Sequence, residues 1–245
     1  MVAVSKKYFM KAIIVFIALI FSWQSGSAQA SLVTVENGMN SNSPNFFLYN
    51  LKNGQIADVF NPDIYAGVEG SPYFSDNWLN ASIELENNMK FDSVLIKLNL
   101  YENKVIFKDD NGRERMVAIK AKKIEIKDKS SKWNNVVFIS GYGEDKNVFF
   151  QSLSDEGKKI RLLKKMNVII TETKVFNGPN QKKFEQKEWY YIFSNGTLFH
   201  ESKNCSSLME AFGNDNKVKN FIAANDIKCN KEKDLKKLVD YYNSY

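Results

Sequence analysis

Residues that could carry out chemistry are few in this chain. There is one histidine, His200, and there are two cysteines, Cys205 and Cys229. One histidine and two thiols are a thin ligand set for a metal, and the Cys-x-x-Cys spacing of many zinc sites is absent. Beyond residue 30 the sequence also lacks Gly-x-Ser-x-Gly, a phosphate-binding loop and His-Glu-x-x-His. The sequence therefore predicts no catalytic residue, no metal site and no cofactor.

Two kinds of hydrolase stay open as alternatives. A Ser–His–Asp arrangement could use only His200, and no neighbour in the sequence is placed for it to activate. A glycosidase with two carboxylates leaves no local pattern, because its acids can lie far apart in the chain. A hydrolase that acts on envelope polymers is therefore kept beside a non-enzymatic role.

Aromatic residues give the best candidates for a binding site. Tyr73 and Trp78 lie in one short segment that begins with Gly70, and Trp189 begins a run of three large rings. Adjacent residues on a strand point to opposite faces of the sheet, so Trp189 and Tyr190 cannot both enter one core. Exposed rings on a sheet can hold a partner. The alternative is that the core covers one face and the C-terminal helices cover the other.

The N-terminus predicts export. Lys6, Lys7 and Lys11 precede ten apolar residues, and Ala28-Gln29-Ala30 supplies the small residues that a signal peptidase requires. The apolar run is too short to span a bilayer. We therefore expect a signal peptide over residues 1–30, no transmembrane span after cleavage, and a location in the periplasm or on the outer cell surface.

Charge and cysteine content agree with an exported protein. The formal charge is +6, and three of the lysines lie in the predicted signal peptide. The other lysines are spread along the chain, so no nucleic-acid partner is predicted. Cys205 and Cys229 are expected to form a disulfide in an oxidising compartment, with a stabilisation of ~3 kcal/mol. Two separate buried thiols, or a metal site that includes His200, are the alternatives.

The hydrophobic pattern predicts a β domain over residues 31–204. Val94, Ile96, Leu98 and Leu100 are expected to point to one face of a strand and Leu95, Lys97, Asn99 and Tyr101 to the other, which is typical of half-buried antiparallel strands. Asn-Gly pairs separate such runs and favour hairpin turns. Residues 160–173 and 184–194 are expected to be two longer strands. No alternation of strands and helices occurs, so a parallel sheet is not expected.

Residues 205–245 follow a helical period instead. Ser207 and Glu210 have the spacing of a capping box, Val218 and Phe221 mark a second helix, and residues 235–242 mark a third. Helices this short need a surface to pack on. The predicted fold is thus α+β: an antiparallel meander that forms a barrel or a sandwich, with three short C-terminal helices on it.

Two parts of the chain carry a resemblance. Gly70–Phe74 with Trp78, Phe91–Val94 and Leu98–Tyr101 form one part, and Asp234 to Asn243 forms the other. The chain resembles an uncharacterised family of exported envelope proteins from Gram-negative bacteria. This resemblance implies an extracytoplasmic location and carries over no activity and no catalytic residue. We expect an envelope protein that binds another protein, a glycan or a small ligand; a structural surface protein is a further alternative.

Overall fold

The computed structural model describes residue 49 and residues 57–245, except for residues 109–110, 175–177 and 201–204. The predicted signal peptide, and the apolar runs at 32–35 and 46–48, lie outside the described residues. The strands are β1 (Ala57–Val59), β2 (Val68–Glu69), β3 (Leu79–Leu85), β4 (Lys90–Asn99), β5 (Lys104–Lys108), β6 (Glu114–Val117), β7 (Ala121–Ile126), β8 (Val137–Ile139), β9 (Phe150–Ser152), β10 (Arg161–Thr173), β11 (Gln181–Ser194) and β12 (Thr197–His200).

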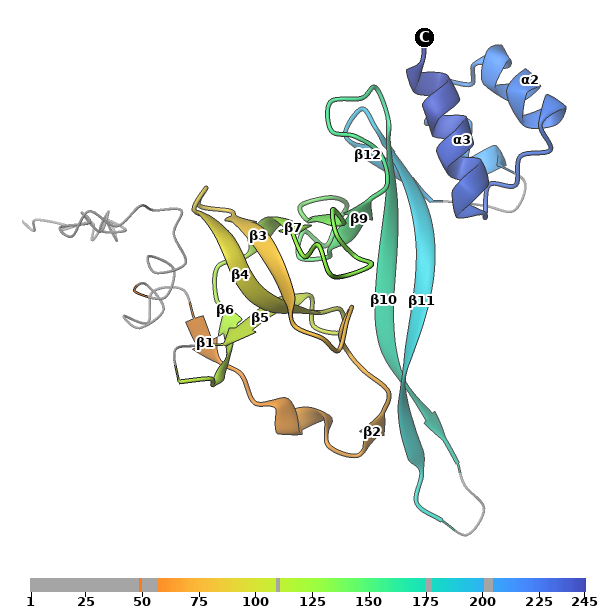
Figure 1. The fold of residues 1–245 in the computed structure, drawn as a ribbon. Helices are drawn as coiled ribbons and strands as arrows, with labels where there is room; N and C mark the ends of the chain where they lie inside the picture. The colour runs from red at the N-terminus through yellow and green to blue at the C-terminus, as the bar shows by residue number, and fades with distance from the viewer. Residues whose placement is uncertain (1–48, 50–56, 109–110, 175–177, 201–204) are drawn as a thin grey trace, which may run out of the picture. The chain divides into compact units, whose positions relative to one another are not determined.

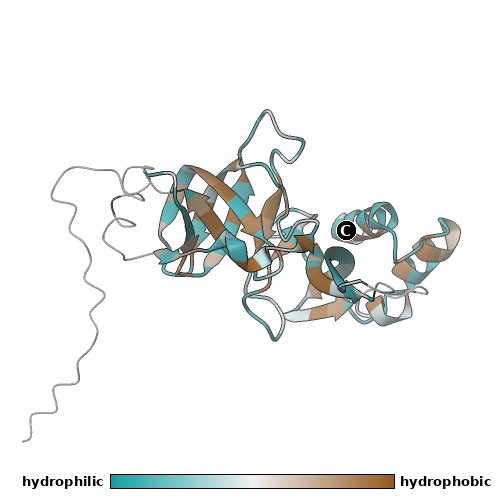
Figure 2. Cartoon of the chain, turned by 90° about the horizontal axis from the view of Figure 1, so that it is seen from below, coloured by the Kyte–Doolittle hydropathy of each residue, from teal (hydrophilic) through white to brown (hydrophobic). Residues whose placement is uncertain are grey.

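All twelve strands belong to one sheet (Figure 1). Its order is β1-β6-β5-β4-β3-β7-β8-β9-β10-β11-β12, and β2 adds to β11 as a parallel strand. Most neighbours are consecutive in the chain and antiparallel, which confirms the predicted β-rich meander. Figure 2 shows hydrophilic and hydrophobic residues alternating along the strands. The inner face of β3 and β4 contains Ile83, Phe91 and Ile96 and forms the main core. We call the opposite side the outer face.

The prediction of a closed barrel was wrong. In the described residues the two end strands, β1 and β12, do not pair with each other. β9 is only three residues long and pairs with Leu163–Lys165, so most of β10 is not held beside it. The β10–β11 hairpin extends beyond β9, and its Met166, Val168 and Phe184 pack in the main core. One sheet thus folds over its own inner face.

The segment that precedes β3 fixes this folded arrangement. Gly70 has φ +86°, and a Cβ atom there would lie 3.4 Å from the carbonyl oxygen of Phe184. Glycine allows both the positive φ and the close approach to β11. Tyr65 lies edge-on to Phe184, with ring centroids 5.5 Å apart. These contacts hold the far half of the hairpin against residues 60–70.

The C-terminal module, which we define as residues 205–245, packs on the near half of the hairpin. It contains the 3-10 helix η2 (Ser206–Leu208) and the α-helices α2 (Asn216–Ala224) and α3 (Glu232–Asn243). Leu235, Leu238 and Val239 of α3 share a core with Leu162 and Ile192 of the hairpin. Figure 1 shows α3 beside this end of β10 and β11. The predicted Cys205–Cys229 disulfide is confirmed.

Only two of the three predicted helices are α-helices. In place of the first one there is the 3-10 helix η2, which ends at Leu208; turns follow, and Gly213 and Asn214 then adopt positive φ, +62° and +55°. Both residue types tolerate this backbone conformation, which ends a helix. Asp215 then caps α2 by accepting a hydrogen bond from the amide of Lys217. No helix in the described residues combines the length and apolar character needed to cross a membrane.

A partly buried ion-pair network joins the module to the sheet. Lys164 of β10, whose side chain is 13% exposed, lies 3.1 Å from Glu232 at the start of α3. Lys236 lies 2.8 Å from the same carboxylate. Burial raises the pKa of Glu232, but hydrogen bonds from Lys236 and Lys164 outweigh it and hold this pKa below its usual value. The charged carboxylate therefore stabilises the folded module.

Replacing Glu232 by glutamine is expected to lower the free energy of unfolding at pH 7 by about 1 kcal/mol, because Lys164 loses its nearest carboxylate and solvent screens part of the effect. A carboxyl group whose pKa is lowered on folding stabilises the folded state at pH values above its unfolded pKa, which is about 4.3 for glutamate. This stabilisation is lost as the pH falls through the pKa of the folded state. Urea unfolding at pH 7 and pH 3 measures this difference, which should be smaller at pH 3.

Glu86→Gln is the matched control for this measurement. Glu86 forms a similar ion pair, 3.0 Å from Lys120, but its side chain is 55% exposed. Exposed pairs typically contribute less than about 1 kcal/mol, so this variant should change stability little at either pH. Equal losses for the two variants would contradict the special role of Glu232.

Candidate binding surface on the outer face

The segment from Gly70 to Trp78 places two of the predicted binding aromatics on the outer face. The carbonyl of Pro72 accepts a hydrogen bond from the amide of Leu100, and the amide of Phe74 donates to the carbonyl of Leu98. These bonds lay the segment along β4, in line with β3. Phe74 points into the core, where its ring lies 4.9 Å from that of Phe138. Its neighbour Tyr73 is half-buried.

Tyr73 and Trp78 share a lysine. The ammonium group of Lys97 lies 4.9 Å from the ring centroid of Tyr73 and 5.2 Å from that of Trp78. Lys108 of β5 places its ammonium group 5.0 Å from the same Trp78 ring. Each such contact is worth ~0.5–1 kcal/mol at an exposed site. We call these four residues the aromatic–lysine surface.

The two ammonium groups of this surface have no ion-pair partner among the described residues, although Glu114 lies opposite Lys108 in the sheet. In the described part of the chain neither Lys97 nor Lys108 forms an ion pair or a hydrogen bond with a carboxylate. Both positive charges are nevertheless held at the same indole ring. Like charges repel one another, so a negatively charged group bound between them would be stabilised. The surface therefore has the chemistry of an anion site with ring faces beside it.

Carboxylates also act on Tyr73, and one of them, Glu114, is the cross-strand neighbour of Lys108. Burial raises the pKa of Tyr73 to about 12, and the negative charges of Glu114, Glu102 and Asp76 add to this effect. The hydroxyl of Tyr73 therefore stays protonated well above neutral pH and can donate a hydrogen bond. An anion bound here would be attracted by the two ammonium groups and repelled by these carboxylates.

Trp189, the third predicted binding aromatic, belongs to another part of the sheet. It pairs with Lys165 across β10 and β11, and Lys165 pairs with Phe150 of β9. Its neighbour Tyr190 packs with the C-terminal module, and Tyr191 packs with a small cluster around Phe150. The described residues show no ring contact between Trp189 and Tyr73 or Trp78. Trp189 is therefore not part of the aromatic–lysine surface.

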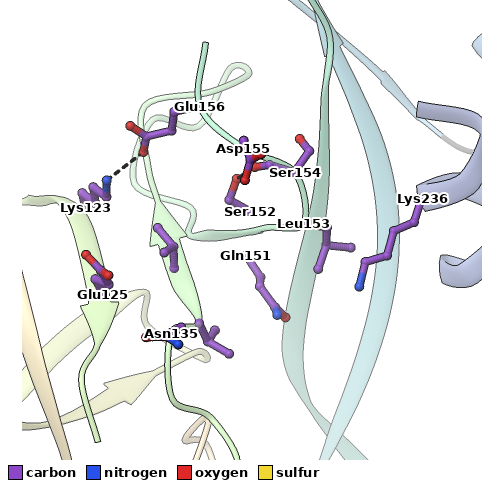
Figure 3. A pocket seen from close by; sticks show the side chains of 12 residues that line it. Lys123, Glu125, Asn135, Gln151, Ser152, Leu153, Ser154, Asp155, Glu156 and Lys236 are labelled. Atoms are coloured by element: carbon purple, nitrogen blue, oxygen red, sulfur yellow. Dashed lines mark hydrogen bonds and ion pairs between the residues drawn. The ribbon is translucent and has the colours of Figure 1, made fainter. Parts of the chain in front are cut away.

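A polar groove lies farther along the sheet. One cavity of about 520 Å³ is lined by β7, by the residues around β8 and β9, and by Lys236 of α3. Figure 3 shows Lys123 and Glu125 on one side of it and Lys236 on the other. A second cavity of about 260 Å³ lies beside β3 and β4 and shares Lys123 and Glu125 with the first. We call the two cavities together the polar groove.

The residues first considered for metal binding do not form a metal site. Cys205 and Cys229 are joined to each other, so neither offers a thiolate. His200 lies on β12, where its ring contacts that of Tyr191 at 4.9 Å. Among the described residues no three histidine, cysteine, aspartate or glutamate side chains are grouped as metal ligands. The alternative metal site of His200 with the two cysteines is therefore excluded by the disulfide.

Comparison of the chain with protein-family models, with curated proteins and with solved structures finds no match. The resemblance of the Gly70–Trp78 segment to exported envelope proteins thus stays a prediction. Any function must be argued from the chemistry of the outer face.

Proposed function

We propose that this chain is a non-enzymatic, extracytoplasmic binding protein that holds an acidic polysaccharide on its aromatic–lysine surface. The observation that carries the proposal is the pair of ammonium groups, from Lys97 and Lys108, that lie over Trp78 and form an ion pair with none of the described carboxylates. Sugar rings can stack on aromatic side chains, and lysines attract the carboxylates of acidic sugars. The N-terminal export pattern and the disulfide support a location in the envelope or beyond it.

A polysaccharide fits this face better than a protein partner does. Protein interfaces usually have a dehydrated centre of large apolar residues with a polar rim. Here the rings lie under ammonium groups, and the neighbouring groove is lined mainly by charged and amide side chains. Such groups suit a ligand rich in hydroxyl groups.

The hydrolase alternative has less support. Among the acids of the polar groove, Glu125 lies 2.6 Å from Lys127 and Glu156 lies 2.9 Å from Lys123. Each of these two carboxylates is held by a lysine and not left free to reach a ligand. We therefore assign the groove no reaction.

The proposal predicts that the chain from residue 31 onward, with its disulfide formed, binds hyaluronan and polygalacturonate and does not bind neutral dextran. Replacing both Lys97 and Lys108 by glutamine should weaken binding at least tenfold, and Trp78→Ala should weaken it by a similar factor. Isothermal titration calorimetry at two salt concentrations measures both effects. Binding by the unaltered chain should weaken as salt rises, because ions screen exposed charges.

Lys132→Gln provides the matched control. Lys132 also lies over an indole, 4.5 Å from the ring centroid of Trp133, but outside the aromatic–lysine surface. This variant should bind as the unaltered chain does. The proposal would be overturned if the unaltered chain bound none of the acidic polymers, or if the Lys97/Lys108 double variant bound them with unchanged affinity. The far-ultraviolet circular dichroism of each variant shows whether it has folded.

A further inference from the structure

The outer face continues from the aromatic–lysine surface into the polar groove. Side chains two positions apart on a strand lie on the same face, so Trp78, Asn80, Ser82 and Glu84 follow one another along β3. Ser82 and Glu84 line the smaller cavity of the groove. Leu95 of β4 pairs with Asn80 of β3 and is 55% exposed. It lies between the aromatic–lysine surface and the polar groove. Trp78, Ser82 and Glu84 therefore share one face, whereas Lys236 comes from α3, which packs on the opposite face of β10 with Leu162.

The groove itself is elongated across the strands. Its smaller cavity lies over β3, β4 and β7, and its larger cavity extends from β7 past β9 to α3. Ser82 lies four positions after Trp78, a distance of roughly 13 Å along the strand. From β3 across β7 and β8 to β9 there are three strand spacings, roughly 14 Å. The path is longer than a disaccharide, so a segment of polymer can occupy it.

The charges of the groove differ from those of the aromatic–lysine surface because most of them are already paired within the protein. Glu84 lies 3.3 Å from Lys90 and 2.9 Å from Lys122. The ion pairs of Glu125 with Lys127 and of Glu156 with Lys123 have the same character. The hydroxyl of Ser82 donates to Asp92. A groove with paired charges favours hydrogen bonds to neutral groups over binding of a further ion.

We infer that the polar groove is a second subsite, which holds neutral sugar residues of the same polymer whose acidic residue lies at Trp78. This inference rests on the proposed function and adds the class of polymer: one in which acidic and neutral sugars alternate. The aromatic–lysine surface takes the acidic group, and the groove takes the hydroxyl and amide groups that follow it along the chain.

Chain length tests this inference. Hyaluronan alternates an acidic and a neutral sugar, so a hyaluronan decasaccharide should bind at least tenfold more tightly than its tetrasaccharide. Oligogalacturonates carry an acid on every sugar and should gain less from the same increase in length. Lys123→Glu adds a carboxylate next to Glu125 and Glu156 and should reduce the affinity for the decasaccharide to that for the tetrasaccharide. The double variant Lys123→Glu/Glu156→Lys restores an ion pair with the two charges exchanged. It should therefore regain most of the affinity for the decasaccharide.

The outcomes separate the two proposals. If both hyaluronan lengths bind equally and Lys123→Glu changes neither, the groove is not a subsite, while binding at Trp78 stands. If the decasaccharide advantage is present and Trp78→Ala removes binding at both lengths, both proposals are supported. If neither hyaluronan length binds, the proposed function fails and the second subsite fails with it. If Lys123→Glu binds the decasaccharide with unchanged affinity, the proposal that the groove is a subsite is overturned, even if the unaltered chain binds the decasaccharide more tightly than the tetrasaccharide.

Discussion

Replacing Asn99 by leucine is expected to lower the free energy of unfolding by about 2–4 kcal/mol, because three polar groups lose their partner. The Asn99 side chain is fully buried. Its Oδ1 accepts hydrogen bonds from the amides of Tyr101 and Glu102, both at 3.0 Å, and its Nδ2 donates to the hydroxyl of Tyr65 at 2.6 Å. Leucine has a similar size but can replace none of these bonds. Equilibrium urea unfolding measures the loss.

Tyr65→Phe separates the contributions to this loss. It removes only the hydroxyl and keeps the ring that packs against Phe184, so the expected cost is ~1 kcal/mol. Burial raises the pKa of Tyr65 well above its usual value. The unfolded chain therefore ionises first as the pH rises above about 10, and stability falls there in the unaltered chain and less in Tyr65→Phe. A loss for Asn99→Leu no larger than that for Tyr65→Phe would contradict the role given to the two amides.

Replacing both Cys205 and Cys229 by serine is expected to destabilise the C-terminal module by ~3 kcal/mol, because the disulfide closes a loop between residues 24 apart. The module packs on Leu162 and Ile192 but not on the main core. Its opening can therefore be separate from global unfolding. Amide hydrogen exchange should speed up about a hundredfold in α2 and α3, which corresponds to ~3 kcal/mol.

The strands β3, β4 and β7 give the internal control for this experiment, because their amides should exchange at unchanged rates. Acceleration throughout the sheet would mean that the module and the main core unfold together. No acceleration in α2 and α3 would mean that the disulfide contributes little to the module. Thiol titration of the denatured, unreduced chain checks the starting material, in which no free thiol is expected.

Local patterns predicted the strands well and their distant partners poorly. Alternation along β4 placed Lys97 opposite to Val94 and Ile96, so the outward direction of Lys97 was available from the sequence alone. The turn residues also predicted most hairpins. The packing of Phe184 against Tyr65 could not be predicted, because it depends on how far the β10–β11 hairpin extends beyond the short strand β9. The barrel was wrong for the same reason.

The candidate site was predicted in part. Tyr73 and Trp78 were chosen as aromatic residues of one short segment that begins with Gly70, and the structure brings them together at Lys97. Lys108 was missed because its approach to Trp78 depends on the pairing of β4 with β5. The polar groove was missed because its walls come from distant segments, including Lys236 of α3. Trp189 carries the same ring chemistry, but the order of the strands places it elsewhere.

The parallel pairing of β2 with β11 has a consequence for the order in which the chain folds. Val68 pairs with Lys182, whereas Trp78 meets its partner Lys97 within a short stretch of sequence. Closing a long loop costs more entropy than closing a short one, and a chain made from its N-terminus has no β11 until late in synthesis. The aromatic–lysine surface can therefore form once β3, β4 and β5 have paired. Gly70 can pack against Phe184 only after β11 has been made. During that interval the main core lacks Met166, Val168 and Phe184, so part of the inner face of β3 and β4 stays exposed to aggregation until the β10–β11 hairpin packs on it.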